Sequence, residues 1–341
     1  MTEQLFPQGQ RLKPLRKGPL TSSHLVRWCA AQQNWDKIHY DVDYARNIAG
    51  LKERVINGGL KQHYLVQMLQ ENLADDITIS RLKYDFLSPD FVNESLEVRG
   101  QIFGSGIIGN HRVLQIGLEV WNLDQEKVST TAKAHIVLPA QSDIANTLDP
   151  DFLPARLDER IKPADEQVPR QIKDCIGTVF ESAESDYPVD LSRLRLFCDA
   201  IGGMPAIHYD LAAARRAGHD NVLAPHLFPI HGLEASPDSL SLSEDPEALG
   251  REAMSEIGRN FGRMFGIPNS GMVNGGNDVE FHSFLQLGER VKAASTLLEA
   301  RIKQGRVGGS MLIATSLNRY FTTSDRLLLR ERQSIIYRNF Q

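Results

Sequence analysis

Cysteine is scarce in this sequence, which has three among 341 residues, and no two of them form a CxxC pair. This scarcity excludes a disulfide framework and the usual zinc-binding spacings, so no metal site is expected. Cys29 and Cys198 lie among apolar residues. We therefore interpret both as small buried hydrophobic side chains rather than as reactive thiols.

Long apolar runs and an excess of basic charge are also missing. No apolar run reaches the ~18 residues of a membrane span, and no apolar stretch typical of a signal peptide follows the charged N-terminal residues. The 38 Lys and Arg residues are scattered and are outnumbered by 43 Asp and Glu residues, which gives a net charge of −5. Since a nucleic-acid interface needs a basic face, we expect a cytoplasmic protein with neither nucleic-acid nor membrane partners.

The sequence does contain an internal repeat. The segment Ile38–Arg46 returns as Ile207–Arg215 at an offset of 169 residues, and both copies begin Ile-His-Tyr-Asp. The same offset pairs Trp28 with Phe197 and Cys29 with Cys198. A match sustained without a gap implies a duplication, and therefore two related modules.

Composition divides the chain further. Residues 1–20, with several Pro, Gly and basic residues, predict an irregular lead-in, and residues 139–165, with four prolines and many acidic residues, predict a linker. The first module then spans 21–138 and the second spans 166–341. Later segments of the second module match the first at an offset of 195, which leaves 26 additional residues. We place this insertion at about 232–258.

The first module combines helical and strand patterns. Short helices are expected at 23–33, capped by Ser22 or Ser23, and at 41–49. Asn57-Gly58-Gly59 then opens a longer helix with apolar residues at helical spacing. Segments rich in β-branched residues predict four strands: Ser80–Phe86, Ser95–Phe103, His111–Asn122 and Lys127–Leu138. One buried helix followed by an antiparallel run of strands is an α+β arrangement.

The segment Gly104–Gly109 matches the pattern GxGxxG. A dinucleotide-binding fingerprint must follow a strand and open a helix in a parallel unit. These glycines lie between two predicted strands, and no helical pattern follows them. We therefore expect a hairpin connection and no dinucleotide cofactor.

The two copies of the repeat differ just before the shared histidine. Asn34 precedes His39 by five residues, whereas Gly203 stands at that place before His208. A histidine can exchange protons near neutral pH, and an amide on the same loop can hold a water in place. The first loop can therefore perform acid–base chemistry, whereas the second lacks the accompanying side chain.

The glycine pair after Asn57 offers a second chemical feature. The start of a helix presents backbone N–H groups at the positive end of its dipole, which suits a developing oxyanion. Glycine at this place lets a ligand carbonyl approach closely. Together with the histidine loop, these groups suit the addition of water to an alkene conjugated with a carbonyl.

The histidine loop resembles that of the MaoC-like (R)-specific enoyl-CoA hydratases, whose motif reads roughly Gly-Asp-x-Asn-Pro-x-His. The first copy keeps His39 but has Asn34 at the Asp position and Asp36 at the Asn position. It looks more like the subgroup of 3-hydroxyacyl-thioester dehydratases type 2 and mesaconyl-CoA hydratases. The second module resembles the degenerate MaoC-like partner domain in these segments: Leu223-Ala224-Pro225, Val273–Gly276, Glu280-Phe281-His282 and Ile335–Arg338.

This resemblance implies a double hot-dog fold, in which each module is an antiparallel sheet wrapped around a central helix. The two sheets would pair edge to edge, with an acyl-CoA thioester bound between the modules. CoA would be part of the substrate, no separate cofactor would be needed, and a homodimer is an assembly that the sequence leaves open.

The implied reaction is the reversible (R)-specific hydration of a trans-2-enoyl-CoA, or the dehydration of a 3-hydroxyacyl thioester. His39 would be the acid–base group, Asn34 would hold the water, and the Gly58 N–H would stabilise the oxyanion. Asp36 is the alternative partner of His39. Gly59, Trp35 and His208 are expected to line the substrate site.

Two other functions stay open. A hot-dog thioesterase usually needs a carboxylate near the helix start, and Asp36 is the only candidate close to Asn57-Gly58-Gly59. A non-catalytic scaffold that binds acyl thioesters would retain the fold but not the chemistry. Loss of enoyl absorbance with a panel of enoyl-CoA esters separates the hydratase from both.

Overall fold

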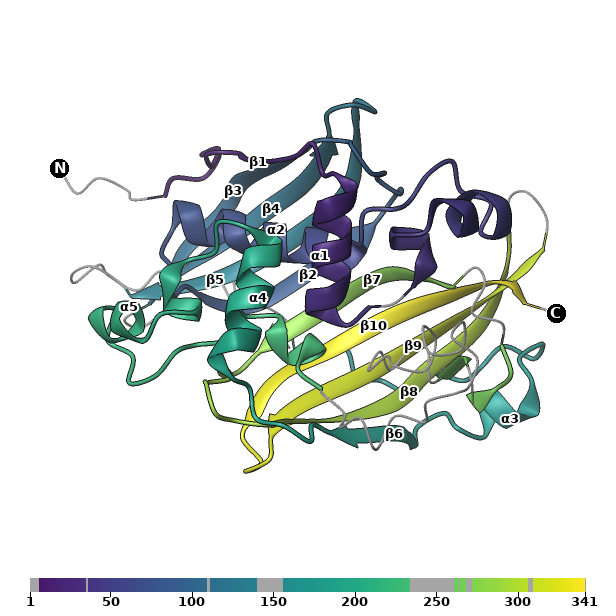
Figure 1. Cartoon of the computed structure of the whole chain (residues 1–341). Helices are drawn as coiled ribbons and strands as arrows, with labels where there is room; N and C mark the ends of the chain where they lie inside the picture. Colours follow the sequence, from purple (N-terminus) through teal and green to yellow (C-terminus); the bar gives the residue numbers. More distant parts are fainter. Residues whose placement is uncertain are drawn as a thin grey trace.

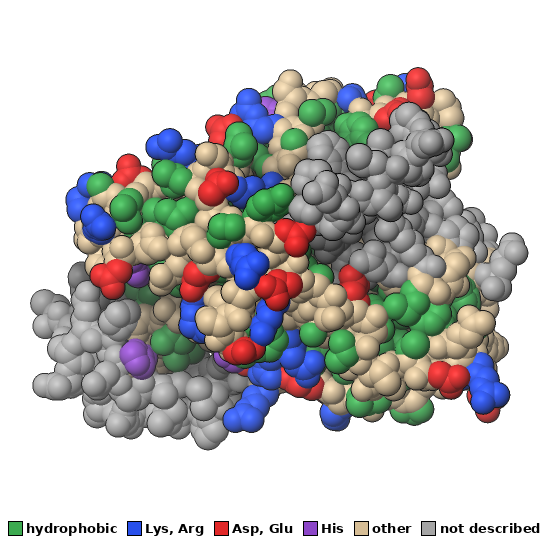
Figure 2. Space-filling view, turned by 60° about the horizontal axis from the view of Figure 1, so that its bottom comes forward, with side chains coloured by type: hydrophobic (Ala, Val, Ile, Leu, Met, Phe, Trp, Pro, Cys, Tyr) green, Lys and Arg blue, Asp and Glu red, His purple; other side chains and the backbone are tan. Residues whose placement is uncertain are grey.

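The computed structural model describes residues 6–34, 36–108, 111–139, 156–233, 261–262, 264–267, 272–305 and 309–340. Trp35, most of the predicted linker and most of the predicted insertion therefore lie outside the described residues. Within them, no helix is long and apolar enough to cross a membrane. Acidic and basic side chains are intermixed on the face shown in Figure 2, which has no continuous basic area.

The described residues form one antiparallel sheet of ten strands in the order β1-β3-β4-β5-β2-β7-β10-β9-β8-β6 (Figure 1). The four strands predicted for the first module are confirmed, although three of them extend further than expected. The strands are β1 (Leu15–Lys17), β2 (Thr78–Phe86), β3 (Leu96–Ile108), β4 (His111–Asn122), β5 (Lys127–Pro139), β6 (Val179–Glu184), β7 (Met272–Phe281), β8 (Val291–Gln304), β9 (Ser310–Thr322) and β10 (Leu327–Phe340).

The sheet has an approximate two-fold relation about its middle. Strands β2 and β7 pair antiparallel and join the two halves edge to edge, as the resemblance implied. Lys83 lies opposite Asp278, and these two residues are also related by the repeat offset of 195. Arg81 reinforces this junction through two bonds to the Asp278 carboxylate, at 2.6 and 2.7 Å.

Helices cover one face of this sheet. The central helix α2 (Gly58–Asn72) begins at Asn57, whose side chain accepts from the Gly59 N–H at 2.7 Å. Every residue from Leu60 to Gln70 is buried, because the sheet and the outer helices enclose α2 on all sides. The outer helices α1 (Ser22–Gln32) and α4 (Leu191–Ile201) lie side by side (Figure 1).

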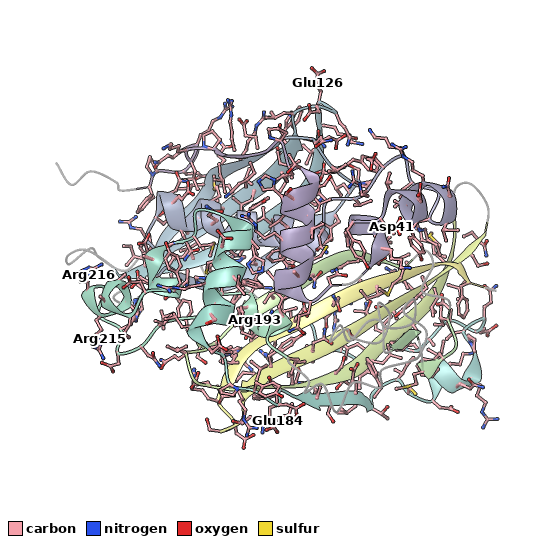
Figure 3. The ribbon with its side chains drawn as sticks, viewed as in Figure 1. Asp41, Glu126, Glu184, Arg193, Arg215 and Arg216 are labelled. Atoms are coloured by element: carbon pink, nitrogen blue, oxygen red, sulfur yellow. The ribbon has the colours of Figure 1, made fainter. Side chains whose placement is uncertain are left out.

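One local prediction in the first module was wrong. The cap of α1 is Thr21 rather than Ser22 or Ser23, and the Thr21 N–H donates to His24 Nδ1 at 3.2 Å. The short helix expected at 41–49 is present over residues 42–48, and its larger part, Tyr44–Ile48, is a π-helical turn. Asp41 still caps this turn by accepting from the Tyr44 N–H at 2.9 Å, and its place is labelled in Figure 3.

The two histidine loops are held in the same way. Val55 N–H donates to Ile38 O at 3.0 Å, and Leu223 N–H donates to Ile207 O at 3.2 Å. These bonds make Val55 equivalent to Leu223. The same equivalence places Pro225 at the position of Asn57 and His226 at the position of Gly58.

The second half departs from the first after this point. A 3-10 turn, Phe228–His231, stands where α2 begins in the first half, and residues 234–260 lie outside the described part. Four further short elements are present: the 3-10 turns Lys37–His39 and Ala206–His208, α3 (Arg170–Lys173) and α5 (Leu211–Arg216).

The described part of the GxGxxG segment belongs to a hairpin, as expected. Gly104 and Gly106 lie within β3, and Ile108 pairs with His111 at the start of β4. Cys29 and Cys198 are buried, and burial raises the pKa of each thiol to about 12. The interpretation of both as core residues is therefore confirmed.

Four histidines are buried where the halves meet: His63, His208, His226 and His231. His63 and His231 pack against the rings of Trp28 and Phe197. Burial lowers the pKa of His208 and His231 to about 3 and that of His226 to about 4, and it also lowers the pKa of His63. All four are therefore neutral in the folded protein.

These histidines predict that the protein loses stability in mild acid. Below ~6.5 the unfolded chain binds protons that the folded chain does not, whereas above this pH neither state does. The free energy of unfolding should therefore be highest above pH ~6.5 and should fall by up to about 1.4 kcal/mol per histidine per pH unit below it.

Urea unfolding at pH 7.5, 6.5 and 5.5 measures this loss. His111 is exposed, so His111→Gln should leave the pH dependence unchanged, whereas His231→Phe should reduce its slope. An unfolding midpoint that stays constant from pH 7.5 to 5.5 would show that the buried histidines do not resist protonation.

Candidate active site

A cavity of about 460 Å³ lies between the two halves, beside the N-terminus of α2. The first half contributes the histidine loop, the start of α2 and the end of β2. The second half contributes residues from β7, β9 and β10. The predicted residues Asn34, Asp36, His39, Gly58 and Gly59 all line this cavity. The structure thus brings together five predicted site residues.

His39 is the group in this cavity best suited to acid–base chemistry. It is 7% exposed, and its Nδ1 lies 2.8 Å from the carbonyl oxygen of Val55. Because a carbonyl can only accept, Nδ1 carries the proton. Nε2 is then the unprotonated nitrogen, and it accepts from Asn57 Nδ2 at 3.1 Å. The Val55 carbonyl therefore fixes both the tautomer and the orientation of the ring.

Asn57 joins the histidine to the helix start, a role that sequence reasoning missed. Its amide donates to His39 Nε2, while its carbonyl oxygen accepts from the Gly59 N–H. The only signal in the sequence was the common use of asparagine at an N-cap. The Asn57 side chain thus fixes the position of the His39 ring relative to the N-terminus of α2.

Asn34 and Asp36 follow α1 and shape the histidine loop. Asn34 is 4% exposed, and its Oδ1 accepts from the Asp36 N–H at 3.0 Å. Asp36 caps the next turn by accepting from the Ile38 N–H at 3.3 Å. Both side chains line the cavity. Each also accepts a hydrogen bond from a backbone N–H within the loop. Whether either acts on a water stays a prediction.

The glycines at the helix start are closely surrounded. A Cβ at Gly58 would lie 3.0 Å from the Phe86 ring, and one at Gly59 would lie 2.8 Å from Asn57 Oδ1. Within the described part of the chain, the Gly58 N–H donates to no group, whereas the Gly59 N–H is used by Asn57. Gly58 is therefore the donor that remains for a bound carbonyl.

A buried ion pair supports this corner of the cavity. Lys61 on α2 donates to Asp90 at 2.7 Å, and the two side chains are 3% and 0% exposed. Burial lowers the pKa of Lys61, and the Asp90 carboxylate opposes that shift. The Asp90 carbonyl also accepts from the Ile56 N–H at 2.8 Å, which anchors the residue next to Asn57.

His208 does not reach this cavity. It is fully buried, and its Nδ1 donates to Leu223 O at 2.9 Å, which repeats the bond between His39 and Val55. Its Nε2 lies 2.9 Å from Gln70 Nε2, so a side chain of α2 closes the second loop. Gln67, also on α2, donates to Gly203 O at 2.9 Å. The substrate-lining role predicted for His208 is therefore not supported by its position.

Several side chains on the second half's strands also line the cavity and were not predicted, among them two buried polar ones. Asn277 on β7 is 4% exposed, and Glu331 on β10 is fully buried. Next to them, Tyr84 donates to Gln62 on α2, and the Gln62 amide lies 3.2 Å from His231 Nε2. Arg193 on α4 donates in turn to His231 O at 3.3 Å, and its place is labelled in Figure 3.

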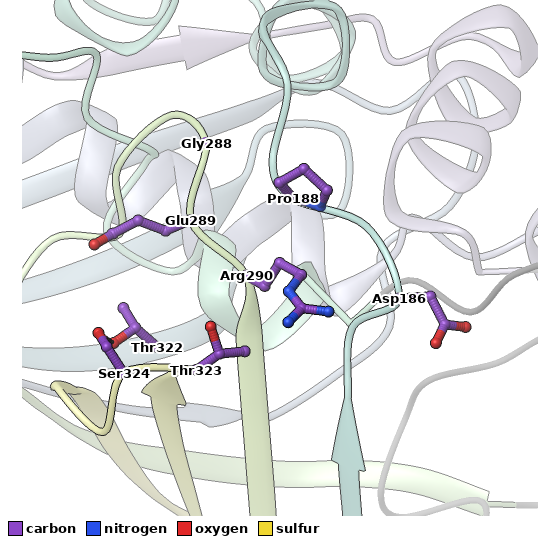
Figure 4. A pocket seen from close by; sticks show the side chains of 8 residues that line it. All are labelled: Asp186, Pro188, Gly288, Glu289, Arg290, Thr322, Thr323 and Ser324. Atoms are coloured by element: carbon purple, nitrogen blue, oxygen red, sulfur yellow. Dashed lines mark hydrogen bonds between the residues drawn. The ribbon is translucent and has the colours of Figure 1, made fainter.

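A second depression, of about 540 Å³, lies at the turn between β9 and β10 (Figure 4). Its lining includes Asp186, Arg290 and Thr323 but no residue of either histidine loop. Among the described residues, no group of three or more His, Cys, Asp or Glu side chains could hold a metal ion. The cavity at α2 is therefore the candidate active site.

Two family models match the chain, one in each half. The model described as hydroxyacyl-thioester dehydratase type 2 matches residues 6–92. The model described as FAS1-like, dehydratase domain region matches residues 174–330. A curated relative, a UPF0336 protein from Thermobifida fusca (strain YX), is 28% identical over 162 residues, which cover 46% of this chain and 91% of the relative.

Solved structures share the whole fold at low sequence identity. A putative MaoC domain protein dehydratase from Chloroflexus aurantiacus superposes with a TM-score of 0.68 at 9% identity, covering 98% of this chain and 97% of that one. A conserved hypothetical protein from Mycobacterium tuberculosis, described as a double hotdog fold, gives a TM-score of 0.60 at 14% identity, with coverages of 97% and 96%.

These comparisons confirm the α+β double hot-dog fold and the resemblance to MaoC-like dehydratases. The two family matches support a dehydratase or hydratase role at the coarse level of a hydro-lyase. The descriptions of the two family models specify neither the acyl group nor the direction of the reaction.

Proposed function

We propose that this double hot-dog chain, whose halves match two dehydratase domain models, catalyses the (R)-specific hydration of a trans-2-enoyl-CoA and its reverse. The observation that carries the proposal is the pairing of His39 with Gly58 in one cavity. The unprotonated Nε2 of a neutral histidine lies beside a helix start whose first N–H is unused within the described residues.

In the proposed reaction, the thioester carbonyl accepts a hydrogen bond from the Gly58 N–H. This donor draws electron density from the conjugated alkene and stabilises the enolate oxygen as negative charge develops. The dipole of α2 favours the same charge. The close fit of Phe86 against Gly58 keeps the carbonyl next to the backbone.

Water is activated at Nε2 of His39. A water molecule replaces the Asn57 amide as the partner of Nε2, and the amide groups of Asn34 and Asn57 hold it in place. As the water oxygen bonds to C3, its proton passes to Nε2 and the alkene electron pair moves toward the carbonyl. The imidazolium then returns a proton to C2, so that one water is added overall. Dehydration follows the same path in reverse.

A panel of trans-2-enoyl-CoA esters of increasing chain length tests the proposal with three readouts. Hydration removes the enoyl absorbance without releasing a free thiol. Release of free CoA thiol at a comparable rate would indicate the thioesterase alternative. Binding of the esters with neither change would indicate a scaffold. We expect loss of absorbance alone.

The identity of the base gives a separate prediction. If His39 acts alone, kcat/KM should rise with pH through a single ionisation, near ~6.5 before any shift by the site. Asp36→Asn should preserve that rise, because the Asp36 carboxylate caps a turn in this structure. Asn34→Asp should retain or increase activity, unless the added charge raises the pKa of His39 too far.

Rate profiles of the two variants between pH 5 and 9 provide the measurement. Loss of turnover in a folded Asp36→Asn protein would instead make Asp36 the partner of His39.

A further inference from the structure

The second half supplies a cluster of buried polar side chains that the proposed reaction does not use. We name Asn277, Asn318, Glu331 and Gln333 the polar wall. Glu331 is fully buried and accepts from the side-chain amides of Asn277 and of Asn318, the latter at 3.0 Å, and from the Tyr320 hydroxyl at 3.4 Å. All of the polar wall except Asn318 lines the cavity.

The polar wall has no counterpart in the first half. In the register of the sheet, Asn277 pairs with Gln333 and Glu331 pairs with Asn318. The equivalent pairs in the first half are Leu82 with Ala134 and Ala132 with Leu118. All four of these residues are buried and apolar.

The two sets of residues differ in whether they border the cavity. The first half's apolar quartet belongs to the closed core, whereas the polar wall borders the open cavity. Burying a carboxylate and three amides costs stability compared with the apolar set. Folding therefore does not require polar groups at these four positions. Because only the half that borders the cavity has them, we infer that they bind a ligand.

The polar wall offers mainly hydrogen-bond acceptors. Glu331 accepts from the side chains of Asn277, Asn318 and Tyr320, and a carboxylate can only accept. Asn277 Oδ1 is also buried, and it has no hydrogen-bond partner among the described residues. A ligand that donates a hydrogen bond would satisfy this oxygen, whereas an alkyl chain would leave it unsatisfied.

The polar wall lies near a point on α2 that is one turn beyond the glycines at the start of the helix. Tyr84, which pairs with Asn277 in the sheet, donates to Gln62 on α2. Gln62 follows Gly58 by four residues, which corresponds to roughly 6 Å along the helix axis. A thioester carbonyl at Gly58 would therefore direct its acyl chain toward the polar wall.

We propose that the polar wall binds a hydroxyl group on the acyl chain, so that the preferred substrates are hydroxylated acyl thioesters. This inference rests on the proposed function for its placement of the thioester at Gly58. A hydroxyl would donate to Asn277 or Glu331, and the Gln333 amide could donate to its oxygen. An acyl group that ends in a carboxylate would meet the Glu331 charge and is disfavoured.

Binding of unreactive saturated esters tests the inference without turnover. Isothermal titration calorimetry would compare hexanoyl-CoA with 6-hydroxyhexanoyl-CoA and octanoyl-CoA with 8-hydroxyoctanoyl-CoA. Since a hydrogen bond to a charged group contributes about 1.5–3 kcal/mol, the hydroxylated member of at least one pair should bind about 10- to 100-fold more tightly. Adipyl-CoA should bind more weakly than hexanoyl-CoA.

The test variants replace residues of the polar wall with the residues found at the equivalent positions of the first half. Glu331→Ala and Asn277→Leu introduce the residues found at the equivalent positions, Ala132 and Leu82, and each should remove most of the preference. Glu97→Gln is the matched control. Glu97 on β3 forms ion pairs with Arg16 on β1 and with Arg99, and it does not line the cavity. It should leave the preference intact.

Equal or tighter binding of the alkyl ester in every pair would overturn the inference. The wild-type comparison needs no variant, so the result does not depend on whether Glu331→Ala folds. If hydroxylated esters bind preferentially but no enoyl ester is hydrated, the proposed function is wrong and the inference about the polar wall is supported. If enoyl esters are hydrated but hydroxylated esters do not bind more tightly, the inference is wrong and the proposed function is supported.

Discussion

Replacing His39 with alanine should lower kcat by roughly 10²–10⁴, the usual contribution of a positioned acid–base group. His208→Ala should change kcat far less, although the two histidines stand at equivalent places in the repeat. The reason is that His39 lines the cavity, whereas His208 is fully buried and Gln70 covers its Nε2. His208→Ala should mainly reduce stability, because it leaves the Leu223 carbonyl and Gln70 without their partner.

Steady-state kinetics of both variants, with thermal unfolding to establish that each is folded, measures this asymmetry. His39→Gln is a useful companion variant, because glutamine retains polar atoms but cannot exchange a proton near neutral pH. Similar losses of kcat in folded His39→Ala and His208→Ala proteins would mean that the working loop was wrongly assigned.

Gly58→Val should reduce kcat/KM by roughly 10²–10³, a loss typical of removing one oxyanion donor. The valine side chain would fill the approach to the Gly58 N–H, and its Cβ would lie 3.0 Å from the Phe86 ring. Gly58→Ala retains the N–H with a smaller side chain and should lose much less. Gly117→Ala is a matched control, since a Cβ there would meet its nearest neighbour at 3.6 Å.

The measurement is kcat/KM for one enoyl-CoA ester across this series, with circular dichroism spectra to compare folding. Near-normal turnover of a folded Gly58→Val protein would rule out the Gly58 N–H as the group that binds the carbonyl.

Much of the first module could be predicted because its signals are local. Asn57-Gly58-Gly59 marks the start of α2 through the capping preference of asparagine, and the β-branched runs mark the four strands. The edge-to-edge pairing of β2 with β7 followed only from the resemblance, because it depends on contacts between residues almost 200 positions apart. The π-helical turn Tyr44–Ile48 has no distinct sequence pattern.

The candidate site was predictable only in part, for the same reason. Repetition of the histidine loop identified His39, and the missing side chain at Gly203 favoured the first copy, which is the one that lines the cavity. The bond between Asn57 and His39 joins residues from separate elements, so no spacing in the sequence reveals it. Glu331 lies in a strand whose sequence does not indicate which residues face the cavity, and only the folded structure shows that it lines the cavity.

The stereochemistry of hydration tests the central claim most directly. Wild-type protein would convert a trans-2-enoyl-CoA, and chiral chromatography would resolve the 3-hydroxyacyl product. If His39 delivers water to C3 from one face of a thioester held at Gly58, as we propose, the product should be the (R)-3-hydroxyacyl-CoA alone, and folded His39→Ala protein should form it roughly 10²–10⁴ times more slowly. An (S) or racemic product, or full formation of the (R) product without His39, would contradict this claim.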